Sequence, residues 1–226
     1  MLRQMLPMEG SAMVSYRDFR LSKRNEPQFQ HLKLLLYWPI FGVLFLYVER
    51  LYKVSKYIPV SCPLDDYIPF CEFFLVPYLF WFIFLVGMHL YLLHFDTEGF
   101  QKFMKFIIIT YSVTTVIYLL IPTCQELRPP EFERDNPFTR FLVGFYQFDT
   151  NTNVCPSLHV VGSLAVVFAA NHTARFSSPG WMVAFWAVGI LICVSTVFLK
   201  QHSIIDVILA LPLCAFGYRC TYHTRT

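Results

Sequence analysis

Two titratable side chains, His202 and Asp206, lie four residues apart at the junction of two strongly apolar stretches. If His202 opens a helix, this spacing places Asp206 one turn further along the same helix face. The carboxylate then accepts a hydrogen bond from one imidazole nitrogen and leaves the other nitrogen free to act as a nucleophile. The alternative is a histidine at a helix start with an incidental aspartate.

A second histidine, His159, also lies at the head of an apolar stretch, in the run Pro156-Ser157-Leu158-His159. Proline and serine are ordinary signals for a helix start, so the helix is expected to begin near Ser157 with His159 in its first turn. The free N–H groups and the positive end of such a helix attract an anion such as phosphate. The run therefore has two interpretations, a plain helix start and an anion site with a histidine beside it.

The composition indicates a membrane protein. Of the 226 residues, 56% are hydrophobic and only 15% are charged, whereas soluble domains carry about 25% charged residues. A net charge of +3, with no long basic stripe, argues against nucleic acid as a partner. The basic residues are instead expected at an anionic membrane surface.

Six apolar stretches have about the ~20 residues that a helix needs to cross a bilayer. They are 33–51, 71–94, 103–122, 157–174, 180–200 and 202–219. The expected fold is an all-α integral membrane protein, a six-transmembrane-helix bundle. Residues 1–32 are expected to form a cytoplasmic N-terminal segment, and residues 33–226 a single membrane catalytic domain with the last two spans in a tight hairpin.

Six spans place both termini on one side of the membrane, and that side holds the larger share of the 18 lysines and arginines. The termini are therefore expected in the cytoplasm. This topology collects segment 123–156, the start of the fourth span and the last hairpin at the outer face. The polar residues gathered there include Arg128, Ser157, His159, His202 and Asp206. Ionisable groups at the ends of membrane helices are costly and usually functional.

Arg128 adds a fixed positive charge with a planar fork suited to phosphate oxygens. Its alternative interpretation is an anchor at the membrane interface. The seven cysteines form no CxxC pair and show no metal-ligand spacing. Four of them are expected on the outer side, where an oxidising environment would allow a disulfide; they are Cys62, Cys71, Cys124 and Cys155.

The three runs together resemble a known motif set. Arg128-Pro129, then Pro-Ser-x-His, then Ser-x6-His-x3-Asp from Ser195 to Asp206 is similar to the three-part motif of the type 2 phosphatidic acid phosphatase superfamily. The resemblance covers the chain from about residue 30 to its end. It implies a six-helix membrane bundle that transfers phosphoryl groups.

The resemblance also implies a role for each matched residue. His202 corresponds to the nucleophile that attacks phosphorus, Asp206 orients it, and His159 protonates the leaving group. Two further matches concern the phosphate. Arg128 and Ser157, with the amides that follow the serine, would bind it, and Ser195 would support the third motif.

Two positions depart from the family pattern. Ile121 stands where the first motif has a lysine, and Thr196 stands where the third motif has an arginine. Both differences remove positive charge from the expected phosphate site, and Lys200 is the candidate to replace part of it. The serine-to-aspartate run and the Pro-Ser-Leu-His run look closer to the inositol phosphorylceramide synthase and sphingomyelin synthase branch. Those relatives transfer a phosphoryl-alcohol head group to another lipid.

Three functions remain open. The first is hydrolysis of a membrane lipid phosphate such as phosphatidate, phosphatidylglycerophosphate or a polyprenyl diphosphate, through a phosphohistidine and without a metal or cofactor. The second is lipid head-group phosphotransfer in the same fold. The third is a non-enzymatic transporter or scaffold, which the scarcity of charge at the span centres argues against. The expected partners are a lipid phosphate and membrane lipids, and the oligomeric state is not predicted.

Two further segments each have two interpretations. The aromatic-rich stretch from Phe73 to Phe84 either lines a slot for a lipid or packs as an ordinary core or lipid-facing stripe. Asp65 and Asp66 either approach a head group or belong to a plain polar loop.

Overall fold

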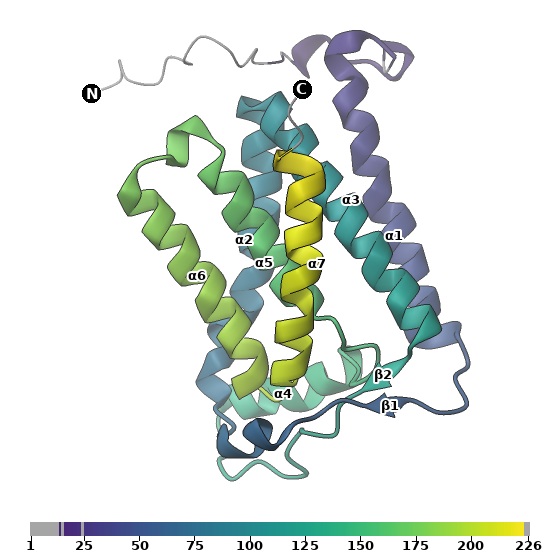
Figure 1. The fold of residues 1–226 in the computed structure, drawn as a ribbon, viewed down its shortest axis with the longest axis vertical. Helices are drawn as coiled ribbons and strands as arrows, with labels where there is room; N and C mark the ends of the chain where they lie inside the picture. Colours follow the sequence, from purple (N-terminus) through teal and green to yellow (C-terminus); the bar gives the residue numbers. More distant parts are fainter. Residues whose placement is uncertain (1–13, 15, 24, 224–226) are drawn as a thin grey trace.

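The structure, a computed structural model, describes residue 14, residues 16–23 and residues 25–223. Residues 1–13, 15 and 24 of the expected N-terminal segment lie outside that part. The described chain is all-helical except for two strands of two residues each (Figure 1). Within it, five helical segments are long and apolar enough to cross a membrane; they are Pro27–Leu51, Glu72–Phe95, Thr97–Leu120, Pro179–Phe198 and Ile204–Tyr222.

The elements follow one another in a simple order. The α-helices are α1 (Tyr37–Leu46), α2 (Leu75–Phe95), α3 (Thr97–Leu120), α4 (Pro137–Phe148), α5 (Leu158–Asn171), α6 (Pro179–Phe198) and α7 (Ile204–Tyr222). Short helical turns are η1 (Tyr16–Asp18), η2 (Leu21–Lys23), η3 (Pro27–Leu36), η4 (Tyr47–Leu51), η5 (Pro63–Tyr67), η6 (Glu72–Phe74) and η7 (Ala174–Phe176). The strands are β1 (Ile58–Pro59) and β2 (Thr123–Cys124).

The long helices expose large apolar side chains over much of their outer surface. Ile83, Val86 and Leu90 on α2 are each more than half exposed, and Val183 on α6 is 68% exposed. Apolar surface of this extent is costly in water and is solvated by lipid tails in a membrane. The exterior is therefore consistent with a multi-pass membrane protein.

The fourth expected span is present as α5, but it is shorter than predicted. Its 14 residues rise about 21 Å, less than the ~30 Å hydrocarbon core. It packs against α2, α3, α6 and α7, and most of its side chains are buried. Gly162 permits the closest approach, because a Cβ there would lie 2.8 Å from both the Trp81 ring and the Tyr111 hydroxyl. Five of the six predicted spans are therefore long enough to cross a membrane, and α5 is not.

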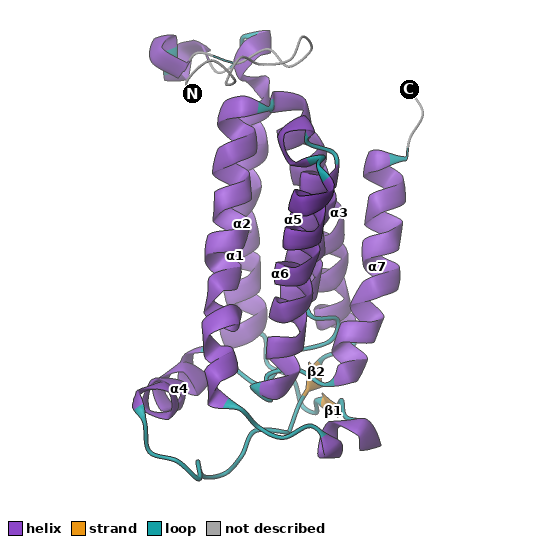
Figure 2. Ribbon diagram, turned by 90° about the vertical axis from the view of Figure 1, so that its left-hand side faces the viewer, coloured by secondary structure: helices purple, strands orange, loops and turns teal. Residues whose placement is uncertain are grey.

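Helix α4 was not expected from the sequence. Asn136 caps it by accepting hydrogen bonds from the backbone N–H groups of Phe138 and Thr139, and Pro137 occupies its first turn. The helix lies across the lower end of the bundle (Figures 1 and 2). It buries Thr139 and Leu142 and exposes large apolar side chains such as Phe141, Val143 and Phe148. The Asn136-Pro137 pair is the sequence signal that could have predicted the start of this helix.

The loops at this lower end are tied together. Strand β1 pairs in parallel with β2, and Cys124 forms an isolated bridge with Thr152. The connections that precede α2, follow α3, precede α5 and precede α7 therefore meet at one end of the bundle (Figure 1), as the six-span topology requires. The four cysteines considered for disulfides lie in these connections and all are unpaired.

Candidate active site

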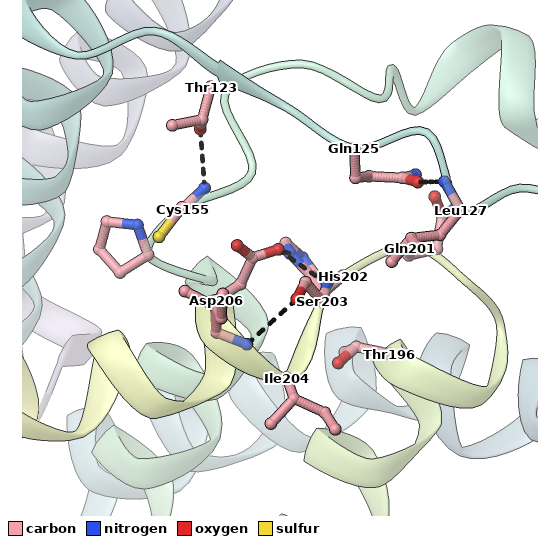
Figure 3. Close-up of polar contacts among 12 residues, drawn as sticks. Thr123, Gln125, Leu127, Cys155, Thr196, Gln201, His202, Ser203, Ile204 and Asp206 are labelled. Carbon is pink, nitrogen blue, oxygen red and sulfur yellow. Dashed lines mark hydrogen bonds and ion pairs between the residues drawn. The ribbon is translucent and has the colours of Figure 1, made fainter. Parts of the chain in front are cut away.

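The His202–Asp206 pair forms at the N-terminus of α7 (Figure 3). His202 Nδ1 lies 3.0 Å from Asp206 Oδ2, which also accepts a hydrogen bond of 3.0 Å from the backbone N–H of Ser203. The helix does not begin at His202 as expected, because Ser203 is its N-cap and Asp206 turns back to complete a capping box. The contact with the imidazole follows from that cap. If Nδ1 donates to the carboxylate, Nε2 keeps a lone pair.

Asp206 is fully buried and has a thiol neighbour. Burial, followed by the negative charge of Asp206, raises the pKa of Cys155 to about 12, so this thiol stays protonated at neutral pH. The backbone N–H of Cys155 is held by the Thr123 hydroxyl at 3.1 Å. The carboxylate of Asp206 therefore sits among packed neighbours that fix its position.

The turn between α6 and α7 positions His202. Lys200 has a φ of 54°, a left-handed conformation that lets the chain reverse just after a helix C-terminus. The backbone N–H groups of Gln201 and His202 then both donate to the Thr196 carbonyl, at 2.9 and 3.1 Å. Lys200 Nζ donates to the Asp65 carbonyl at 2.7 Å, so the expected phosphate partner is engaged with a loop of the protein.

Asp65 supports this turn from 138 residues away. Its carboxylate accepts hydrogen bonds from the Ser203 hydroxyl at 2.6 Å, the Ile204 N–H at 2.9 Å and the Cys62 N–H at 2.8 Å. Burial acts to raise the pKa of Asp65, but these hydrogen bonds outweigh it and the net shift is downward. Neither of the two interpretations of Asp65 predicted this role. Asp65 belongs to η5, and its carboxylate accepts hydrogen bonds at the N-terminus of α7.

Replacing Asp65 with asparagine is expected to lower turnover about 10-fold or more, because one amide N–H would face the Ile204 or Cys62 donor. The matched control is Asp66→Asn, since Asp66 is the exposed neighbour.

Because the pKa of Asp65 is lowered in the fold, its ionised form stabilises the protein above pH ~3.9. That contribution disappears as the pH falls through the lower folded value. Initial rates with lipid phosphate measure the turnover, and thermal unfolding in detergent between pH 3 and 7 measures the contribution to stability. An Asp65→Asn variant with wild-type turnover would contradict the first expectation, and an unfolding profile against pH identical to wild type would contradict the second.

His159 is the second residue of α5, in the first turn after the N-cap residue Ser157. Its imidazole packs between two rings of α2, with centroid distances of 4.3 Å to Tyr78 and 4.5 Å to Trp81. Its Nε2 atom is buried and has no hydrogen-bond partner among the described residues. The ring centroids of His159 and His202 are 5.9 Å apart. The structure thus brings together two imidazoles that are far apart in sequence.

Ser157 is the N-cap residue of α5, two residues before His159. It is fully buried, its backbone N–H donates to the Asp206 carbonyl at 3.2 Å, and its hydroxyl has no partner among the described residues. The first intrahelical hydrogen bond of α5 runs from the Val161 N–H to the Ser157 carbonyl. The N–H groups of the residues between them are the ordinary unpaired donors of a helix start, and they are the nearest anion-binding groups to His159.

Arg128 has a structural role in this arrangement. Its guanidinium donates to the carbonyls of Tyr146, Asp149 and Thr150 and to Gln201 Oε1, and it lies 4.3 Å over the Tyr146 ring. Burial lowers its pKa. Arg128 therefore braces the connection after α4 against Gln201, the neighbour of His202, with most of its donors already engaged.

Ser195 does not reach the other candidate residues with its hydroxyl. Its Oγ atom donates to the Ile192 carbonyl of the same helix at 2.6 Å, and the residue is fully buried. The contact is a local helix hydrogen bond. The part of this motif that holds His202 is the carbonyl of Thr196.

Both histidines line a cavity of about 590 Å³. One end of the cavity is apolar and lies between α1, α2 and α3, where Trp38, Phe41 and Leu85 are among its walls. The other end is polar and holds Glu49, Asp149, Thr150, Asn153 and Gln201 beside His159 and His202. Tyr78, Trp81 and Phe82 line it, so part of the aromatic stretch of α2 faces a cavity.

Comparison of the chain with protein-family models, with curated proteins and with solved structures finds no match.

Proposed function

We propose that the protein is a membrane enzyme that hydrolyses a lipid phosphate through a phosphohistidine at His202. One observation carries the proposal. Two imidazoles, one of them oriented by a buried carboxylate, line the same cavity with their centroids 5.9 Å apart. That separation suits a phosphoryl group with its leaving oxygen, since a nucleophile approaches to ~3–3.5 Å and a proton donor to ~2.6–3.2 Å.

The proposed reaction has two steps. His202 Nε2 attacks phosphorus, the bond from phosphorus to the lipid oxygen breaks, and His159 gives that oxygen a proton. Water then attacks the phosphohistidine, His159 takes a proton from the water, and the N–P bond breaks to release phosphate. Asp206 stabilises the charge that develops on the His202 ring, and the N–H groups at the start of α5 stabilise the phosphoryl oxygens. The motif resemblance to the type 2 phosphatidic acid phosphatases supports this assignment.

The proposal includes a membrane arrangement. The protein crosses the bilayer six times, with α5 as the fourth span. The short length of α5 is tolerated because neighbouring helices cover its ends and keep the backbone there away from lipid. The termini are cytoplasmic, and the end of the bundle that carries α4 and the two strands, the lower end in Figure 1, faces outward. Labelling of residues 125–155 by an impermeant reagent from the cytoplasmic side alone would overturn this orientation.

A second candidate is phosphotransfer to another lipid, and the shape of the cavity favours it. A largely apolar cavity of about 590 Å³ offers an acceptor lipid access to the phosphohistidine in place of water. The two reactions share the first step and differ in the second nucleophile.

An assay of the purified protein in detergent with a panel of lipid phosphates separates the candidates. Hydrolysis predicts release of soluble phosphate, whereas transfer predicts a new phospholipid detected by mass spectrometry. Folded protein that turns over none of the lipids would contradict both reactions and favour a transporter or scaffold.

A further inference from the structure

The polar end of the cavity holds two carboxyl groups, those of Glu49 and Asp149. Apart from histidines, the titratable side chains that line the cavity are Glu49, Asp149 and three tyrosines, Tyr78, Tyr111 and Tyr118; within the described chain no lysine or arginine lines it. Two arginines contact residues of the wall without lining the cavity themselves. Arg50 donates to the Phe148 carbonyl, and Arg128 donates to carbonyl groups and to Gln201 Oε1. A dianionic phosphomonoester with no other charge would therefore meet two carboxylates and no fixed cation.

The same wall holds an unused hydrogen-bond acceptor. Asn153 lines the cavity, is only 5% exposed, and its Oδ1 has no partner among the described residues. Its amide orientation is fixed because Nδ2 donates to Glu49 Oε1 at 2.9 Å. The Thr150 hydroxyl donates to the other oxygen of Glu49. A buried acceptor without a donor is costly, so this group calls for a ligand that donates a hydrogen bond.

The Asp149 carboxylate is linked to each of the two histidines through one intervening residue. Asp149 Oδ2 accepts from the Tyr78 hydroxyl at 2.7 Å, and the Tyr78 ring packs against His159. The same oxygen lies 3.4 Å from Nε2 of Gln201, which precedes His202. A ligand with its phosphorus between the histidines therefore places a group a few bonds away against this wall.

We propose that the substrate carries a primary ammonium group a few bonds from its phosphorus, held by Glu49, Asp149 and Asn153. This inference rests on the proposed function and names its substrate class. A primary ammonium has three N–H donors and a positive charge, which match two carboxylates and the free Asn153 oxygen. A trimethylammonium group has the charge but no N–H to offer. With an amino-alcohol phosphate, His202 bonds to phosphorus, the bond from phosphorus to the lipid oxygen breaks, and water later releases phosphate, as in the proposed mechanism. With phosphatidylethanolamine, the bond from phosphorus to the diacylglycerol oxygen breaks, phosphoethanolamine stays on His202, and water releases it as phosphoethanolamine.

The test compares lipids in mixed detergent micelles. Phosphatidylethanolamine and a long-chain 2-amino-alcohol phosphate represent the two sources of the amine, and phosphatidylcholine and phosphatidate are the comparison lipids. At least one amine lipid is expected to have a kcat/KM about 10- to 100-fold above both comparison lipids, the range of a lost charge-assisted hydrogen bond. Equal or greater turnover of phosphatidate would overturn the amine assignment and leave the proposed phosphatase intact.

Variants locate the effect. Glu49→Gln is expected to lower the ratio of amine-lipid to phosphatidate turnover about 10-fold or more, and Asn153→Leu is expected to lower it in the same direction. The control is Glu133→Gln, because Glu133 is exposed on the segment before α4 and does not line the cavity. An unchanged ratio in Glu49→Gln would contradict the assignment.

A binding measurement separates failure of the substrate class from failure of catalysis. With the His202→Ala variant, the amine lipids are expected to raise the thermal unfolding temperature more than phosphatidate or phosphatidylcholine does. This result, with no turnover of any lipid by wild type, would support the amine site and refute the proposed function. Equal stabilisation by all four lipids would refute the amine site.

Discussion

Replacing His202 with alanine is expected to lower turnover by a factor of about 10⁴ or more, the size of effect seen when a covalent nucleophile is removed. His202 is 8% exposed and its Nδ1 is held by Asp206, and the substitution removes the Nε2 atom that the proposed reaction uses. The substitution leaves the Asp206 carboxylate bound to the Ser203 N–H. The capping of α7 is thus retained.

The matched control is His94→Ala. His94 is an exposed histidine of α2 whose Nδ1 contacts the Leu90 carbonyl, and it does not line the cavity. Initial rates with lipid phosphate and thermal unfolding in detergent are measured for both variants. Turnover by His202→Ala within 10-fold of wild type would refute the nucleophile assignment, provided that the two variants unfold at similar temperatures.

Replacing His159 with alanine is expected to lower turnover of lipid substrates about 10²- to 10⁴-fold, the range of general acid–base catalysis. The reason is specific to the leaving group. A lipid alcohol is a poor leaving group that needs a proton, whereas p-nitrophenolate leaves without one. With a p-nitrophenyl phosphate ester, His159→Ala is therefore expected to form the phosphohistidine at a near-normal rate and release a burst of nitrophenol.

This selective rescue distinguishes the two histidines. His202→Ala lacks the nucleophile and is expected to show no burst with either leaving group. The Trp81→Phe variant is a control for packing, because it keeps an aromatic ring against His159 without the indole N–H. Equal loss for lipid and nitrophenyl substrates in His159→Ala would show that the residue acts through folding and not as an acid.

The apolar stretches were sufficient to predict most of the fold. Continuous apolar runs of about 20 residues specify helices by themselves, and the structure places five such helices close to the expected bounds. The predicted fourth span, 157–174, is longer than α5, which ends at Asn171. Most of α5 is buried by neighbouring helices, so its apolar residues pack against protein and need not extend over the full bilayer thickness. Helix α4 was missed because its apolar residues are interrupted by polar ones and its Asn136-Pro137 start was not weighed.

The candidate site was predictable only where its contacts are local. His202 and Asp206 are four residues apart, so helix spacing was enough to pair them. The approach of His159 to His202 followed from the topology. The contact of Asp65 with Ser203 spans 138 residues, and no periodicity in the sequence encodes it. Charge alone did not predict that the protein's own carbonyl groups accept hydrogen bonds from both Arg128 and Lys200.

The most direct test of the central claim is to locate the covalent intermediate. The protein is mixed with lipid phosphate, quenched in alkali within one turnover, and digested for mass spectrometry. The account predicts one phosphoryl group on the peptide that contains His202, accumulating when His159 is replaced and a p-nitrophenyl ester is used, and absent from His202→Ala. A phosphoryl group on another residue, or none during active turnover, would contradict it.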